Sequence, residues 1–299
     1  MKHVLKTLGF TAIAGLSTYA VAQTSIPNLI DKGRSISVLN DQNLGNTTYS
    51  LPAATADATQ IRLNMKGYVF GFRIVRSDFI SWFDGQNYVG YADMKSSGLA
   101  ALLKKMEIWS VTRGRYDRGG MRPDWHVQQN TDKKNRRVEM NYDRRARVVD
   151  IDIVPPLGSQ GTVPVTPKQR FSANDTISGL LHLTMQGTHV DGELCAGRIP
   201  FFDSKQHYNL RLERIGTKKV KFNGKKEETI HCRAYYEPIA GYDPEDLPSE
   251  EEAGTPLNVY IKYFEEADLH VPVRFTYKIS GFKAVIKVDD IEFVTPQNR

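Results

Sequence analysis

The feature that most constrains the fold is a two-residue alternation of apolar and polar residues near the C-terminus. The alternation runs through residues 271–279 and resumes in residues 282–288, after Ser280-Gly281. Because successive side chains of a β-strand point to opposite faces, this period predicts two long antiparallel strands joined by a tight turn. Pro272 has no amide hydrogen to donate, so it is expected at a sheet edge or a bulge.

The same alternation recurs in shorter segments along the chain. They lie at residues 70–74, 88–94, 106–116, 138–142, 149–153 and 208–212. Asp84-Gly85 and Asn223-Gly224 are typical of hairpin turns. Together these patterns predict a mainly β protein of about ten strands, arranged as one large, strongly curved antiparallel sheet in the form of a half-barrel or β-spiral.

Two short helices are predicted beside this sheet. Residues 97–105 carry leucines at helical spacing after a serine that can cap a helix. In residues 174–185, Asn174 or Asp175 can cap the first turn, and apolar residues follow at the spacing of one helix face. The helices are expected to lie across the concave face. The segments 157–170 and 243–254 are predicted to be loops, because they are rich in Gly and Pro or in acidic residues and Pro.

The N-terminus predicts a signal peptide. Lys2 and Lys6 precede a diluted apolar run at residues 8–16, and Ala20-Val21-Ala22 forms a small-x-small cleavage site. An uncleaved anchor is the alternative, but the apolar run is shorter than the about 20 residues that span a bilayer. The expected division of the chain is a signal peptide at 1–22, a polar tail or edge segment at 23–58, and a single β-rich domain at 59–299.

Cys195 and Cys232 are the two cysteines of the chain. In an exported protein, two cysteines that each lie beside a predicted strand favour one disulfide over two buried free thiols. Closing a loop of this size restricts the unfolded chain and stabilises the fold by about 3–4 kcal/mol in the entropy model.

A basic region extends over residues 113–147. Its candidate anion-binding residues are Arg136, Arg137, Arg144 and Arg145. One interpretation is a site for a polyanion such as a phosphorylated lipid headgroup, and the other is the charged, solvated face of a pair of strands. The net charge of +6 falls by two when Lys2 and Lys6 leave with the signal peptide, and so mild an excess does not indicate nucleic acid.

No catalytic motif stands out in the sequence. The chain contains no His-Glu-x-x-His zinc motif, no Gly-x-Ser-x-Gly elbow and no phosphate-binding glycine-rich loop. His189, Asp191, Glu193 and Cys195 are spaced by two residues and could meet on one strand face, but a polar turn before a disulfide explains them better. We therefore expect no catalytic residues, no metal and no cofactor.

Two motifs around the cysteines resemble a known family. The first contains Phe202, Asp203, Tyr208 and Leu210, and the second, in Tyr-Glu-Pro-Ile-Ala-Gly-Tyr, contains Tyr236, Pro238, Gly241 and Tyr242. The chain resembles the DUF3108 family of uncharacterised envelope proteins of Gram-negative bacteria. It departs from the family pattern at Ser204, where glycine is usual, and at Asn209, where aspartate is common. The resemblance implies a β-rich protein of the cell envelope and implies no catalytic residues.

The leading functional hypothesis is a non-enzymatic periplasmic protein that binds a lipid, lipoprotein or peptide on a concave β surface lined by aromatic residues. The first alternative is a periplasmic hydrolase or modifying enzyme whose site has no familiar motif. The second is a structural partner in envelope assembly. A membrane association would be peripheral, and the sequence leaves the oligomeric state open.

Overall fold

The computed structural model describes residues 35–38, 47–50, 54–98, 100–101, 106–130, 135–279 and 281–295. The predicted signal peptide and most of the predicted helix at 97–105 lie outside these residues. In the described part of the chain, no helix has the length and hydropathy that crossing a membrane requires.

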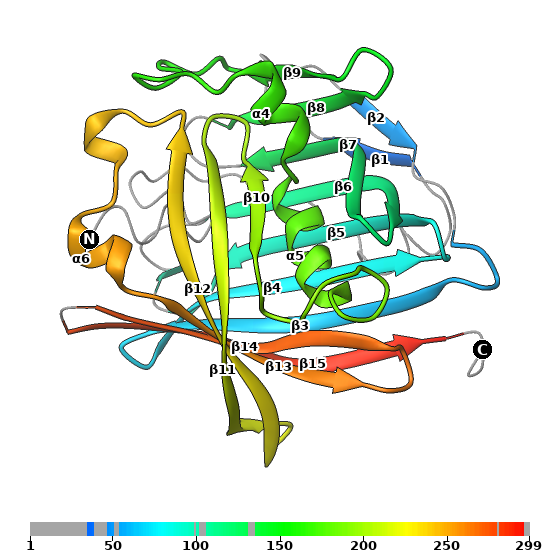
Figure 1. Ribbon diagram of the computed structural model, residues 1–299, viewed down its shortest axis with the longest axis vertical. Helices are drawn as coiled ribbons and strands as arrows, with labels where there is room; N and C mark the ends of the chain where they lie inside the picture. Colours follow the sequence, from blue (N-terminus) through cyan, green and yellow to red (C-terminus); the bar gives the residue numbers. More distant parts are fainter. Residues whose placement is uncertain are drawn as a thin grey trace.

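Thirteen of the described strands form one antiparallel sheet that does not close into a barrel, which confirms the predicted fold class (Figure 1). Their bounds are β3 Thr59–Val69, β4 Phe72–Phe83, β5 Asn87–Ser96, β6 Glu107–Asp117, β7 Gly120–Asn130, β8 Arg137–Asp143, β9 Val148–Val154, β10 Arg198–Phe202, β11 His207–Phe222, β12 Lys225–Ala240, β13 Leu257–Phe264, β14 Leu269–Ile279 and β15 Phe282–Val294. The order across the sheet is β10-β11-β12-β13-β14-β15-β3-β4-β5-β6-β7-β8-β9. Two meanders, β3 to β9 and β10 to β15, therefore meet where the last strand pairs with β3.

Several turns follow the predicted chemistry. Asn223 and Gly224 both have positive φ, at 46° and 77°, as the tight hairpin between β11 and β12 requires. Pro272 pairs with Ile261 at a register shift between β13 and β14, so it lies at a bulge as expected. The sheet is strongly curved, and Figure 1 shows that β10 to β12 cross in front of the β3–β9 meander.

Three α-helices and one 3-10 helix are described: α4 Pro167–Ser172, α5 Thr176–Met185, α6 Glu250–Gly254 and η1 Pro244–Asp246. Helix α5 is the predicted one, and the side chain of Asp175 caps it. The other three correct the loop predictions for 157–170 and 243–254. Thr166 and Ser249 each form a capping box that starts a helix of one to two turns.

The main core lies between the concave face of the sheet and α5. Ile177, Leu181 and Met185 of the helix pack in one cluster with residues such as Phe79 and Leu269. Close approach of helix and sheet requires Gly90 of β5, where an added Cβ atom would lie 2.5 Å from Ile177. Helix α5 thus fills the trough that the curved sheet encloses.

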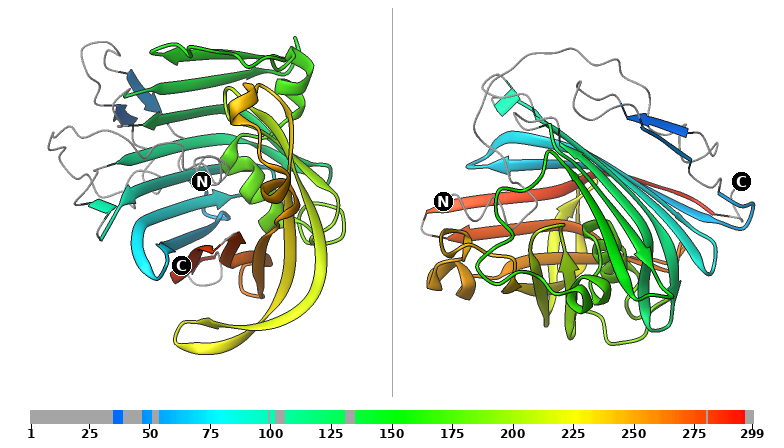
Figure 2. Two further views of the ribbon diagram at one scale, coloured as in Figure 1. Left: turned by 90° about the vertical axis from the view of Figure 1, so that its left-hand side faces the viewer. Right: turned by 90° about the horizontal axis from the view of Figure 1, so that it is seen from above.

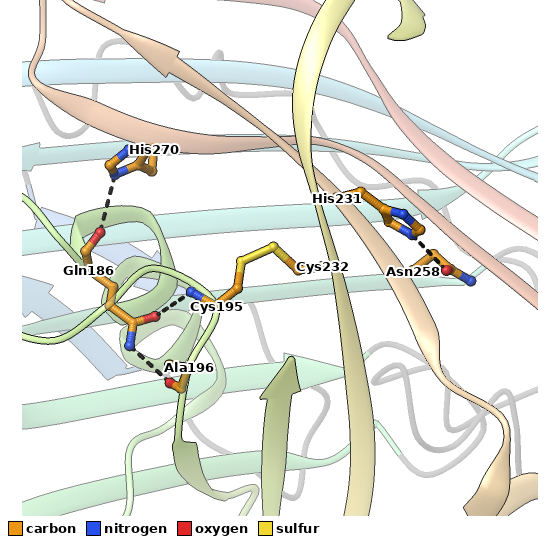
Figure 3. The surroundings of a disulfide bond; sticks show 7 residues. All are labelled: Gln186, Cys195, Ala196, His231, Cys232, Asn258 and His270. Carbon is orange, nitrogen blue, oxygen red and sulfur yellow. Dashed lines mark hydrogen bonds between the residues drawn. A yellow bond between two sulfur atoms is a disulfide. The ribbon is translucent and has the colours of Figure 1, made fainter. Parts of the chain in front are cut away.

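The predicted disulfide is confirmed. Cys195 and Cys232 are joined, with their Cα atoms 5.9 Å apart, and link the turn that follows α5 to β12 (Figure 3). Gln186 at the end of α5 accepts a hydrogen bond from the backbone N–H of Cys195 and donates one to the carbonyl of Ala196. His270 of β14 contacts the backbone oxygen of Gln186 at 3.1 Å, so the bridge is held between helix and sheet.

A second apolar cluster lies on the outer face of the sheet. Side chains of β4 to β7 that point away from α5 form it: Ile80, Trp82, Val89, Tyr91, Val111, Trp125 and Val127, with Trp109 packed against them. The segment that leads into β3 contributes Ala54 and Ala58. This part of the sheet is therefore apolar on both faces.

Candidate functional site

The first family motif and the second form a framework at one edge of the sheet. The rings of Phe201 and Tyr208 stack at 5.3 Å, Tyr208 lies 4.8 Å from Tyr236, and Tyr236 lies 6.3 Å from Tyr242. The hydroxyl groups of Tyr236 and Tyr242 are hydrogen bonded to each other. Burial raises the pKa of both phenols, so this aromatic ladder stays neutral and packs the edge.

The remaining motif residues shape two tight turns that touch. The carboxylate of Asp203 accepts hydrogen bonds from the backbone N–H groups of Lys205 and Gln206. Gly241 has φ of 87°, and a Cβ atom there would lie 1.9 Å from the carbonyl oxygen of Lys205. Ser204 also has φ of 87°, a conformation that favours glycine, which explains why the family pattern carries glycine at this position.

Three other motif residues pack around the same framework. Phe202 is buried in the cluster that joins β8 and β9 to the β10 edge. Leu210 packs against the cluster that contains the disulfide. Pro238 pairs with Tyr208 beside a register shift in β11 and β12. The motifs therefore mark the framework of the fold rather than a ligand site.

The predicted anion-binding arginines separate into two groups. Arg136 donates to the carbonyls of Pro155 and Pro156, at 3.0 and 3.1 Å. Arg137 is buried and bonds to Glu139 at 2.7 Å and Asp152 at 2.5 Å. Both guanidinium groups are thus engaged within the protein, at the end of β8 where the connection from β7 enters.

Arg144 and Arg145 lie at the opposite end of β8, in the turn to β9. At about 3.3 Å per residue, the seven residues of β8 separate the two groups by about 23 Å. Arg145 is exposed, whereas the guanidinium of Arg144 bonds to Asp124 at 2.9 Å and lies 5.9 Å from the ring centre of Phe171. The four residues do not form one cluster, and their role as an anion site stays a prediction.

An open cleft of about 810 Å³ lies at the Arg144 end of the sheet. Arg144 shares its lining with Arg115, Arg118 and Arg122, which come from the β6–β7 hairpin. In an antiparallel meander every second turn falls at the same end, so the β4–β5, β6–β7 and β8–β9 turns meet here. Asp57 and Asp117 are the two acidic residues of the lining, so arginines are in excess.

The arginines of the cleft are held in exposed ion pairs. Arg122 bonds to Asp117 at 2.7 Å, and this hydrogen bond lowers the pKa of that carboxyl group. Arg118 donates to the carbonyl of Thr188 at 2.8 Å. The side chains of Arg115, Arg118 and Arg122 remain at least half exposed, so water and solutes reach them.

Aromatic rings form the inner wall of the cleft. Phe83 and Tyr116 meet edge to face, with ring centres 6.4 Å apart. The imidazole of His189 lies 6.0 Å from Phe83 and 6.3 Å from Tyr116. Phe83 and Tyr116 are 4% and 6% exposed, so a ligand whose anionic group meets the arginines has only the edges of these rings for its apolar part.

The concave face itself offers far less room. Helix α5 and strands β3, β4 and β14 enclose an apolar cavity of about 10 Å³, lined by residues such as Leu63, Leu180 and Phe275. This volume holds about one water molecule. The predicted aromatic groove for an acyl chain is therefore occupied by the protein's own helix in this region.

A buried polar network contains serine, histidine and aspartate but does not form a catalytic triad. Asp175 contacts His126 at 3.2 Å and accepts hydrogen bonds from Thr112 and Ser178. The Ser178 hydroxyl is bonded to Asp175 and to the Tyr88 hydroxyl, not to the imidazole. All five residues are buried, so the network fixes the start of α5 against β5, β6 and β7.

Among the described residues, no three histidine, cysteine or acidic side chains are placed to hold a metal ion. His189 lies 3.7 Å from Asp268, and Cys195 is in the disulfide. Burial lowers the pKa of His182, which lies beside Gly120 at the β6–β7 hairpin, so this imidazole stays neutral.

Comparison with known proteins gives a family and a distant structural likeness. The family model described as "Protein of unknown function (DUF3108)" matches residues 62–287. Ten solved chains match, among them a beta-barrel-like protein of domain of unknown function DUF1849 from Brucella abortus, with 10% identity, a TM-score of 0.43, and coverage of 81% of this chain and 100% of that chain. No curated protein matches.

Proposed function

Because the chain belongs to the DUF3108 family, whose function is unknown, we propose a function from its geometry: a non-enzymatic periplasmic protein that binds an anionic amphiphile in the arginine cleft. The ligand class is the acidic headgroup of a lipid or lipoprotein, with its apolar portion against the aromatic wall. The observation that carries the proposal is the convergence of Arg115, Arg118, Arg122 and Arg144 on one cleft of about 810 Å³.

The weakness of the existing ion pairs supports this proposal. The Arg122–Asp117 pair is half exposed on both sides, and such pairs contribute about 0–1 kcal/mol. A phosphate or carboxylate group can therefore replace the aspartate as the partner of the arginine at little cost. Arginine also presents a planar pair of donors that matches these anions.

The compartment is part of the proposal. Export to the periplasm is inferred from the predicted signal peptide, and the Cys195–Cys232 disulfide is consistent with an oxidising environment. An envelope protein there meets acidic lipids and lipoproteins as abundant anionic amphiphiles.

Binding of short-chain ligands to the mature protein tests the proposal. We would titrate the protein with dihexanoyl phosphatidylglycerol, dihexanoyl phosphatidylcholine and inorganic phosphate by isothermal calorimetry. We expect the phosphatidylglycerol to bind most tightly, and inorganic phosphate to bind more weakly because it lacks the apolar part. Arg118→Gln and Arg122→Gln should each weaken binding about 3- to 10-fold, since each removes one exposed charged contact.

Arg136→Gln is the matched control, because Arg136 lies at the other end of β8 and donates to two proline carbonyls. Equal affinity of the Arg122→Gln variant and the unaltered protein would contradict the proposal, as would equal binding of the two lipids. The hydrolase alternative makes a different prediction, since an incubated ester-linked lipid would then be cleaved, which mass spectrometry detects.

A further inference from the structure

The outer face of β4 to β7 carries all three tryptophans of the protein. Trp82 and Trp125 are 2% and 5% exposed, and Trp109 packs against the same cluster. The outer face of a curved sheet that meets water is normally polar. Apolar side chains that are this well buried on an outer face must be shielded from water by another part of the protein.

The described contacts account for only part of that cover. Ala54 and Ala58 pack against the cluster, the guanidinium of Arg113 lies 5.4 Å from the Trp125 ring centre, and the Trp125 indole donates a hydrogen bond to Glu139 at 2.9 Å. Each large aromatic side chain buries about 150–250 Å² when it is enclosed. Two methyl groups, one guanidinium group and one carboxylate are small against that area.

The chain before Ala54 has the pattern that such a cover requires. Strands β1 Ser35–Val38 and β2 Thr47–Ser50 form a two-stranded antiparallel sheet with Ile36 opposite Tyr49. The register places Ile36, Val38 and Tyr49 with Thr47 on one face, and three serines with Thr48 on the other. A two-stranded sheet is marginally stable by itself, so its apolar face needs a surface to pack on.

The connection is short enough to bring the two apolar faces together. Three residues lie between Ser50 and Ala54, and an extended chain covers at most about 14 Å from one to the other. Ala54 already packs on the tryptophan cluster. Figure 2 shows β1 and β2, in dark blue, on the side of the sheet opposite α5.

From these observations we propose that the β1–β2 sheet acts as a strap that covers the outer tryptophan face. The outer face and the arginine cleft use different residues, so this proposal does not depend on ligand binding in the cleft. The outer face is then an interaction surface whose resident partner is an apolar β-ribbon from the same chain.

Intrinsic fluorescence provides a direct test, because every tryptophan reports on this face. The mature chain from Gln23 is compared with a chain that starts at Ala54 and with the full mature chain that carries Ile36→Ser, Val38→Ser and Tyr49→Ser. In both altered proteins we expect the emission maximum to move to longer wavelength and the acrylamide quenching constant to rise severalfold.

Ser37→Ala with Thr48→Ala is the control, because these residues occupy the other face of the β1–β2 sheet, and its emission should match that of the mature chain. Far-ultraviolet circular dichroism shows whether each protein is folded. If the shortened chain does not fold, the triple variant alone provides the test. Dimerisation of the shortened chain with protected tryptophans would support the proposal, since a second copy would then replace the strap. Unchanged emission and quenching in monomeric altered proteins would overturn it.

Discussion

Replacing Ser204 by glycine should make the protein more stable. Ser204 has φ of 87°, which places an L-residue in a region that glycine adopts without steric cost. The residue is buried in the turn between β10 and β11, where neighbouring contacts hold the backbone in this conformation. The native state of the present sequence therefore carries backbone strain that Ser204→Gly removes.

The expected gain follows from two opposing effects. A non-glycine residue held at positive φ costs about 1–2 kcal/mol. Glycine makes the unfolded chain more flexible, which offsets about 0.4–1 kcal/mol of that gain. The net stabilisation is about 0.5–1 kcal/mol, which raises the melting temperature of a protein of this size by about 1–4 °C.

Ser204→Ala separates the backbone effect from the loss of the hydroxyl group. Alanine keeps the strained φ and lacks the hydroxyl, so the stability difference between the glycine and alanine variants reports the backbone alone. Urea unfolding of both variants, followed by circular dichroism, measures that difference. A glycine variant no more stable than the alanine variant would refute the reasoning.

Two further predictions concern the disulfide and a buried carboxylate. Cys195→Ala with Cys232→Ala should lower the free energy of unfolding by about 3–4 kcal/mol; urea titration measures this, and the unaltered protein should show a similar loss in reductant. Burial raises the pKa of Asp93 to about 6, against the opposing effect of Lys95. The unfolded state therefore releases this proton at lower pH than the native state, and stability should fall by about 1–3 kcal/mol as pH rises from about 4 to 6. Asp93→Asn should flatten that part of the profile in urea unfolding at pH 4 to 7, and an unchanged profile would contradict the assignment.

The sequence was sufficient for the sheet and for α5 because local and long-range signals agree there. Asp175 provides the cap, and Ile177 and Leu181 follow at the spacing of the buried face. Helices α4 and α6 were missed because helices of one to two turns carry no apolar stripe. Their capping boxes, Thr166 with Gln169 and Ser249 with Glu252, were the available signal.

The cleft could be predicted only in part. The candidate arginines were grouped by their closeness in the sequence, whereas their positions in the sheet determine which of them meet. Arg137 and Arg144 are close in the chain but lie at opposite ends of β8. Arg122 belongs with Arg144, because the β6–β7 and β8–β9 turns fall at the same end of the sheet. Counting the turns of the predicted meander would have placed Arg122 and Arg144 at the same end of the sheet.

The filled trough and the apolar outer face depend on tertiary structure. A helix was expected on the concave face, but the sequence does not show how completely α5 fills it, so the space for a ligand there was overestimated. The outer face did leave a signal, since Phe79, Ile80, Trp82 and Phe83 make the end of β4 apolar on both faces, with Ser81 as the one polar residue among them. Such a strand is covered on both sides.

The pairing of β15 with β3 has a consequence for how the protein reaches its native state. Val294 is hydrogen bonded in register beside Gln60, so the middle of the sheet contains the two ends of the domain. High contact order of this kind slows folding. During synthesis the β3–β9 meander must wait, with the β3 edge open, until β15 has been made. The polypeptide is therefore most exposed to aggregation in the interval before β15 pairs with β3.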